Sequence, residues 1–142
     1  MTRRVLILYT ANSARSQMAE GLLRSFAGER FEVVSAGTKP SAVRPEAIAA
    51  MAELGIDISS QRSKHVREFD GQHFDYVITV CDNANESCPI FPDDRERIHW
   101  SVPDPAAVAG SEAERLSAFR HARDTLAESF RGFIEQERQP RR

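Results

Sequence analysis

The chain has 142 residues, of which 41% are hydrophobic and 28% charged, values typical of one soluble globular domain rather than of a disordered segment. Its formal net charge of −2 gives no general attraction to nucleic acid. No apolar stretch approaches the roughly 20 residues of a membrane span, and the apolar run at residues 5–9 is too short for a secretory signal. We therefore expect a cytoplasmic protein that binds neither nucleic acid nor membrane.

Four segments have the apolar or β-branched character of buried strands. They are residues 5–9, 31–36, 74–80 and 97–100. Helical patterns separate the first three, which favours parallel pairing with helices on both faces of the sheet. The sequence therefore predicts an α/β protein, a single domain over residues 1–142 with a four-stranded parallel sheet. Residues 138–142 are expected to form a frayed tail.

Three segments have the spacing of amphipathic helices. The first begins near Ser16 and ends at Gly28, and the second begins at Pro45 and stops at Gly55. The third begins with a capping box of Ser111 and Glu114. We expect the second helix to pack through Ile48, Met51, Ala52 and Leu54, and the third through Leu116, Phe119, Leu126, Phe130 and Phe133.

Three loops follow the carboxyl ends of predicted strands, where parallel α/β sheets bind their ligands. They come after Tyr9, after Val80 and after Trp100. Because the carboxyl ends of parallel strands meet at one edge of the sheet, these loops are expected to lie together.

The loop after the first strand has the composition of an anion cradle. Small, hydrogen-bonding residues let backbone N–H groups turn inward, the following helix adds its positive end, and Arg15 offers a planar fork that matches a tetrahedral oxyanion. The cradle comprises Thr10, Ala11, Asn12, Ser13, Ala14 and Arg15. The alternative is an ordinary strand-to-helix turn, in which Ser13 or Ser16 caps the helix and Arg15 points into water.

Residues 5–21 resemble the opening of the arsenate reductases related to low-molecular-weight tyrosine phosphatases. That family's loop is a cysteine, five residues, an arginine and a serine. Arg15 and Ser16 match it, but Tyr9 stands in place of the attacking cysteine and Ala11 in place of the usual glycine. A phenol, with a pKa near ~10, is a weaker and bulkier nucleophile than a loop thiolate, so we expect Tyr9 to line or plug the pocket.

Residues 77–92 strongly resemble the redox loop of thioredoxin-coupled arsenate reductases and contain both cysteines, Cys81 and Cys88. The resemblance implies that the Cys81 thiol attacks the sulfur of an arsenate adduct, that Cys88 attacks the resulting disulfide, and that thioredoxin reduces the Cys81–Cys88 disulfide. It also implies that Asp104, followed by Pro105, is a general acid. From the residues alone, two unrelated thiols and an ordinary Asp-Pro turn are the alternatives.

The resemblance also assigns supporting roles. Asn12, Ser16 and Glu20 correspond to residues that brace the loop from behind, and Lys64 falls near the place where some members use an acidic residue to help hold potassium. A lysine there would replace the cation, so no potassium site is expected. The four histidines show no ligand spacing, and nothing in the sequence requires a metal or an organic cofactor.

Together these features predict a monomeric arsenate reductase family protein, connected with arsenic resistance, that binds arsenate or phosphate at residues 10–15 and is reduced by thioredoxin. Its turnover is expected to be absent or very slow, because the thiol relay needs three thiols and the chain has two. The alternatives are a non-catalytic oxyanion-binding or sensing protein and a dithiol redox protein that uses Cys81 and Cys88. A low-molecular-weight phosphatase is another, and it would also need the missing cysteine.

Overall fold

The computed structural model of the chain describes residues 3–9, 13–39, 41–80 and 96–138. Its centre is a parallel sheet of four strands in the order β2-β1-β3-β4. The strands are β1 (Arg3–Leu8), β2 (Phe31–Ala36), β3 (Tyr76–Thr79) and β4 (Glu96–His99). The α/β class and the four-stranded parallel sheet are therefore confirmed, and β3 is shorter than the predicted run of residues 74–80.

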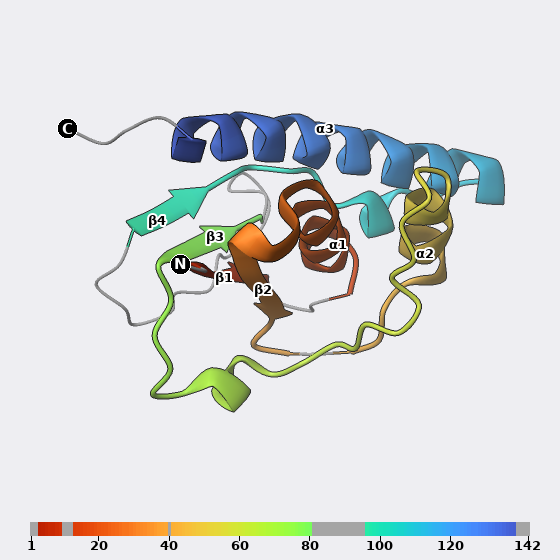
Figure 1. Ribbon diagram of the computed structural model, residues 1–142. Coiled ribbons are helices and arrows are strands. Elements are labelled where there is room, and N and C mark those ends of the chain that lie inside the picture. The colour runs from red at the N-terminus through yellow and green to blue at the C-terminus, as the bar shows by residue number, and fades with distance from the viewer. Residues whose placement is uncertain (1–2, 10–12, 40, 81–95, 139–142) are drawn as a thin grey trace.

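Both faces of β1 are buried, as its continuous apolar run predicts. Val5 and Ile7 belong to the larger core cluster, whereas Leu6 and Leu8 belong to a second cluster on the opposite face. The larger cluster lies under the helices α1 (Arg15–Ala27) and α3 (Glu112–Arg138), which pack against each other. Figure 1 shows α3 running the length of the sheet with α1 beside it.

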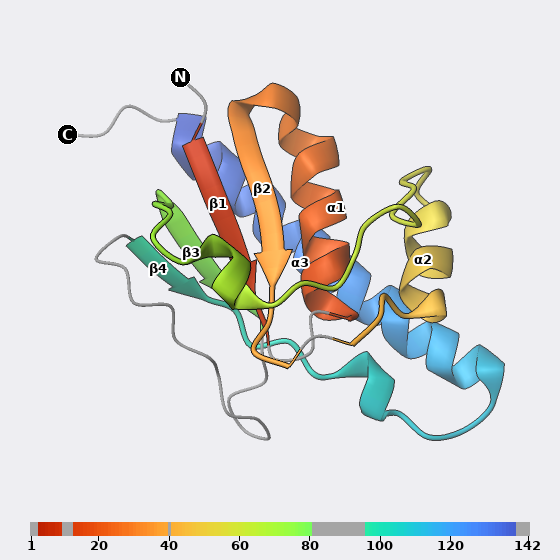
Figure 2. The ribbon, with the colours of Figure 1, turned by 90° about the horizontal axis from the view of Figure 1, so that it is seen from below.

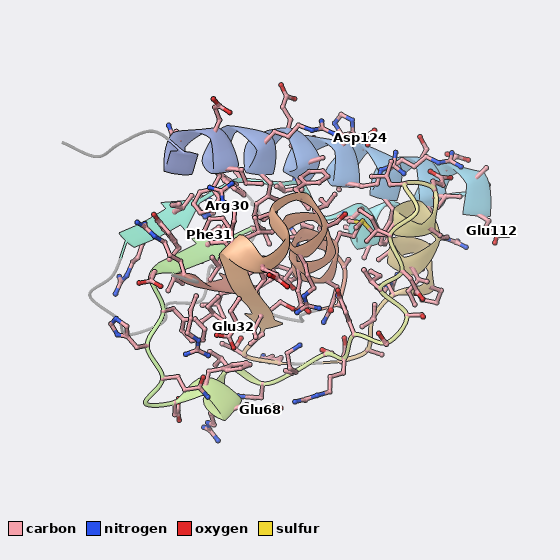
Figure 3. The ribbon with its side chains drawn as sticks, viewed as in Figure 1. Arg30, Phe31, Glu32, Glu68, Glu112 and Asp124 are labelled. Atoms are coloured by element: carbon pink, nitrogen blue, oxygen red, sulfur yellow. The ribbon has the colours of Figure 1, made fainter. Side chains whose placement is uncertain are left out.

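The opposite face of the sheet has a lighter cover. In the described part of the chain, the short 3-10 helix η2 (Val66–Phe69) and the segments around it lie against that face, in front of the sheet in Figure 2. Phe69 and Phe74 pack edge to face there, with ring centroids 5.9 Å apart. Glu68 of η2 projects away from the sheet and pairs with Arg62 (Figure 3).

The final helix begins as the sequence predicts. The Ser111 hydroxyl accepts a hydrogen bond from the Glu114 N–H at 3.1 Å, and the Glu114 carboxylate accepts one from the Ser111 N–H at 3.3 Å. Of the predicted packing residues, Phe119, Leu126, Phe130 and Phe133 are buried, and Leu116 packs at the edge of the core. The helix runs to Arg138, so that residue belongs to α3 and not to the expected tail.

The second helix, α2 (Pro45–Ala52), matches its predicted packing in part. Met51 is buried and Ile48 packs against the core, as predicted, and the other buried residues are Ala47 and Ala50. Ala52 is exposed, and Leu54, 45% exposed, lies beyond the helix end. These two positions were placed wrongly because the predicted helix was extended to Gly55.

Two arginines of α3 join it to the end of α2. Arg120 forms a two-pronged contact with the Glu53 carboxylate at 2.7–3.0 Å. Arg123 donates to the same carboxylate and to the carbonyl of Ala50, both at 2.7 Å. These hydrogen bonds lower the pKa of Glu53 to about 2.

Two shorter 3-10 helices complete the described elements, η1 (Gly28–Arg30) and η3 (Pro105–Ala107). The second follows β4 and packs against α3. No helix of the described residues has both the length and the apolar character needed to cross a membrane.

Candidate active site

Arg15 is the first residue of α1, and its side chain is completely buried. Its Nη1 donates a hydrogen bond of 2.6 Å to the backbone carbonyl of Val102, and its Nη2 lies 3.8 Å from Oδ1 of Asp104. The alternative in which Arg15 points into water is therefore wrong. The guanidinium links the loop after β1 to the segment after β4, as expected for loops at one edge of a parallel sheet.

Tyr9 lies directly after β1 and is 6% exposed. Its N–H donates to the carbonyl of Ala36 at 3.1 Å, which extends the pairing of β1 with β2 by one residue. The Arg15 guanidinium carbon is 4.0 Å from the centre of the Tyr9 ring. A desolvated cation–π contact of this kind can contribute about 2 kcal/mol. The aromatic ring thus contacts the guanidinium, and the expectation that Tyr9 lines or plugs an anion pocket stays a prediction.

The start of α1 carries no serine cap. Its N-cap residue is Ala14, which has no side chain that could accept a hydrogen bond, and the first turn contains no acidic residue. Neither Ser13 nor Ser16 is the N-cap, so the alternative of a serine-capped turn is also wrong. A helix start without a local carboxylate is electrostatically suited to an external anion.

Asp104 lies close to the arginine of the loop, as the resemblance implies. It is the N-cap of η3, and its Oδ1 accepts a hydrogen bond of 2.9 Å from the N–H of Ala106. The Asp104 side chain is 30% exposed, whereas that of Arg15 is completely buried. The carboxyl group therefore has access to solvent and also lies near the guanidinium, and its role as a general acid stays a prediction.

Glu20 is buried on the inner side of α1. Its Oε1 accepts a hydrogen bond of 2.6 Å from the Ser35 hydroxyl, and its Oε2 pairs with Arg24 at 2.9 Å. Lys64 lies 3.7 Å from Oε1 and donates to the carbonyl of Arg62 at 2.9 Å. The carboxylate thus connects α1, the end of β2 and residues 62–64, so it braces the first turns of α1.

The ammonium group of Lys64 adds a second positive charge next to Glu20, at the carboxylate oxygen that Arg24 does not contact in its ion pair. Burial lowers the pKa of Lys64 below its usual value, and the negative charge of Glu20 partly opposes this shift. Within the described ranges, no three His, Cys, Asp or Glu side chains gather closely enough to hold a metal ion.

Sequence reasoning missed several members of this site. The carbonyl of Val102 is invisible to it because a backbone group carries no residue signal, and its partner is 87 residues away. Gln17 and Gln61 form a further link behind the loop, in which Gln61 donates to the Gln17 carbonyl and side chain and Gln17 donates to the Arg62 carbonyl. The sequence did offer one sign of this link, because Gln17 is a polar residue at a position of α1 that faces the protein core.

Several predicted site residues lie outside the described residues. These are Thr10, Ala11, Asn12, Cys81 and Cys88. The structure therefore brings together Tyr9, Arg15 and Asp104, with Ser13, Ala14, Ser16 and Glu20 around the start of α1, and the expectations for the remaining positions stay predictions.

Comparison with known proteins identifies the family of the chain. The low molecular weight phosphotyrosine protein phosphatase family matches residues 4–141. An arsenate reductase of Halalkalibacterium halodurans is 40% identical over 136 residues, which cover 95% of this chain and 98% of that protein. The chain belongs to the arsenate reductase family with the low molecular weight phosphatase fold.

Two solved structures extend the comparison. One is described as an arsenate reductase in the phosphate binding state, with a TM-score of 0.78 and 32% identity, and the match covers 94% of this chain and 98% of that one. The other is a thioredoxin-dependent arsenate reductase of Corynebacterium glutamicum, with a TM-score of 0.59 and 26% identity, covering 92% of this chain and 62% of that one.

Proposed function

We propose that this family member binds a tetrahedral oxyanion, arsenate or phosphate, at residues 10–15, with Arg15 as the principal ligand. The observation that carries the proposal is the position of Arg15, whose side chain is completely buried at the uncapped start of α1. A planar guanidinium beside a helix start combines two oxyanion-binding devices. A similar solved structure is described as being in a phosphate binding state, which supports the choice of ligand.

We further propose that arsenate reduction is absent or very slow. In the thiol relay of the family, a thiolate displaces hydroxide from arsenate, and a second thiolate attacks the sulfur of the adduct. The electron pair of the arsenic–sulfur bond stays on arsenic, arsenite leaves, and a disulfide forms. An adduct of Tyr9 would hold arsenic through the phenol oxygen, and attack of Cys81 on that oxygen would form no disulfide. Tyr9 therefore cannot replace the first cysteine.

Restoring the missing thiol tests this proposal. Arsenite formation is measured with thioredoxin and its reductase for wild type, Tyr9→Cys and the matched control Tyr9→Ser. We expect turnover only for Tyr9→Cys, because loss of the covalent nucleophile removes several orders of magnitude in rate. Robust wild-type turnover that Cys81→Ser abolishes would show that another thiol attacks arsenate, and the proposal would be wrong.

The second candidate is an oxyanion-binding protein without turnover. It is favoured by a site that keeps Arg15 at the start of α1 while Tyr9 occupies the place of the nucleophile. Calorimetric titration with phosphate and with arsenate tests the binding step. Arg15→Lys keeps the positive charge but loses the planar pair of N–H donors that can bind two oxygens of the anion, so we expect binding at least about tenfold weaker. Arg24→Lys, which changes another arginine of α1, is the control, and equal binding by both variants would remove Arg15 from the site.

The cysteine pair, the cellular location and the oligomeric state belong to the same proposal. We propose that Cys81 and Cys88 form a disulfide that thioredoxin reduces, since a related solved structure is a thioredoxin-dependent enzyme. A cytoplasmic location and a monomeric state are the expectations that accompany this thiol chemistry.

A further inference from the structure

The segment Ser101–Pro105, which we call the strap, contributes two polar partners of the Arg15 guanidinium, the carbonyl of Val102 and the carboxylate of Asp104. We propose that the strap is an internal competitor for the anion site, holding Arg15 in an inhibited state that an oxyanion must displace. This inference rests on the proposed oxyanion binding at Arg15.

In the contact with Val102, one hydrogen-bond donor of the guanidinium is already bonded to an acceptor of the protein. The distance from Nη1 to the carbonyl oxygen is 2.6 Å, and both residues are buried. A buried carbonyl that loses its partner is left unsatisfied, so turning Arg15 toward an anion carries a free-energy penalty unless the strap moves as well. Anion binding and strap movement are thereby coupled.

Asp104 adds an electrostatic component to this competition. Its carboxylate is 3.8 Å from Nη2, on the same guanidinium that would bind the ligand. A phosphate or arsenate dianion at Arg15 would lie within range of this negative charge, and like charges in a partly buried site repel strongly. The negative Asp104 therefore weakens anion binding and stabilises the anion-free arrangement.

Tyr9 fixes the orientation in which this competition takes place. The guanidinium carbon lies 4.0 Å from the centre of the Tyr9 ring, within the range of a cation–π contact. The strap contacts the Nη1 and Nη2 groups of the same guanidinium. A change of ligand from the strap to an anion can thus occur at these two nitrogens while the contact with Tyr9 stays in place.

The strap has the local features of a segment that can shift. Pro103 and Pro105 have no N–H groups, so neither position can donate a backbone hydrogen bond to a neighbouring strand. A cleft of about 140 Å³ is lined on one side by strap residues and on the other by residues of α3 that include Ala118 and Ala122. The cleft offers space into which the strap can move when Arg15 releases it.

Trp100 gives a direct optical readout of this movement. It is the only tryptophan of the chain, lies next to the strap, and packs edge to face on Phe130 with ring centroids 4.8 Å apart.

Inorganic phosphate is titrated into the full-length wild type, Asp104→Asn and Asp124→Asn. The amide side chain that Asp104→Asn introduces keeps an oxygen that can cap η3. Asp124, on the outer side of α3 (Figure 3), also pairs with an arginine at 2.8 Å and is a matched control for charge.

Two results are expected. Asp104→Asn binds phosphate about tenfold more tightly than wild type, whereas Asp124→Asn binds like wild type. In wild type, phosphate changes the Trp100 emission and speeds amide hydrogen exchange in residues 101–107, although ligand binding stabilises the protein as a whole. A strap that served only to support the fold would show slower exchange with phosphate.

Two other results would overturn the inference. Equal phosphate affinity in wild type and Asp104→Asn, or calorimetric saturation without a change in Trp100 emission or strap exchange, would show that the strap does not compete, and the proposed binding function would stand. No phosphate binding in any of the three proteins would instead remove the proposed function, and the competition with it.

Discussion

Gly21, in the second turn of α1, offers a sharp test of how this helix is positioned. A Cβ atom added at Gly21 would lie 2.6 Å from Cγ2 of Ile58 and 3.1 Å from Cε of Met51. The first distance is well inside van der Waals contact, so Gly21→Ala forces the helix or Ile58 to move. At Gly132 in α3, an added Cβ meets nothing within 4 Å. The two glycines thus form a matched pair.

The two variants are expected to change the free energy of unfolding in opposite directions. Replacing a helical glycine with alanine stabilises by about 1 kcal/mol through helix propensity, and this gain applies at both positions. Overpacking at Gly21 opposes it by about 1–3 kcal/mol. We expect Gly132→Ala to stabilise the protein by about 0.5–1 kcal/mol and Gly21→Ala to destabilise it by about 1 kcal/mol, a difference of nearly 2 kcal/mol between the two variants.

Urea unfolding of both variants measures this difference, and Ile58→Ala supplies the control for the steric cause. Ile58→Ala alone should destabilise by about 2–5 kcal/mol, because it leaves a cavity. Combined with Gly21→Ala, the loss should be smaller than the sum, since the new methyl group takes part of the space that Ile58 leaves. Equal stabilisation by both glycine variants, or strict additivity with Ile58→Ala, would refute the reasoning.

Three further predictions concern charge and thiol chemistry. The hydrogen bonds from Arg120 and Arg123 lower the pKa of Glu53 from 4.5 to about 2. The ionised Glu53 carboxylate therefore stabilises the fold fully above pH 4.5, and this stabilisation is lost as the pH falls toward 2. Glu53→Gln should flatten the pH dependence of the free energy of unfolding in urea between these two pH values. Because Lys64 places a positive charge beside Glu20, the melting temperature should be the same in potassium and sodium chloride, whereas Lys64→Ala should lower it and make it potassium-dependent; a potassium effect in wild type would contradict this account. Mild oxidant should join Cys81 and Cys88 in one molecule and thioredoxin should release both thiols, as followed by thiol titration and intact mass; two thiols that stay free would show that the pair has lost its redox role.

Local patterns predicted the secondary structure well where one physical signal dominated. The apolar run at residues 5–9 indicated a strand buried on both faces, and Ser111 with Glu114 indicated the start of α3. At α2 the predicted helix ran past its actual end, so Ala52 and Leu54 were wrongly expected on the buried face, whereas Ile48 and Met51 were placed correctly.

The candidate site was predictable only in part. The meeting of Arg15 and Asp104 follows from the topology of a parallel sheet and from family resemblance. The complete burial of Arg15 and its bond to a distant backbone carbonyl do not, because long-range contacts of the main chain leave no trace in the residue pattern. Tyr9 was recognised as an anomaly from its position, yet its cation–π contact with Arg15 became visible only in the fold.

The strand order has a consequence for how the protein folds. Val5 pairs with both Val33 and Tyr76, and the core on its side of the sheet is completed by residues of α1 and α3, so β1 is covered only by partners distant in sequence. Such long-range pairing slows folding, and an apolar strand that stays uncovered favours association between partly folded chains. A variant truncated before Glu112, which lacks α3, should consequently aggregate or engage chaperones.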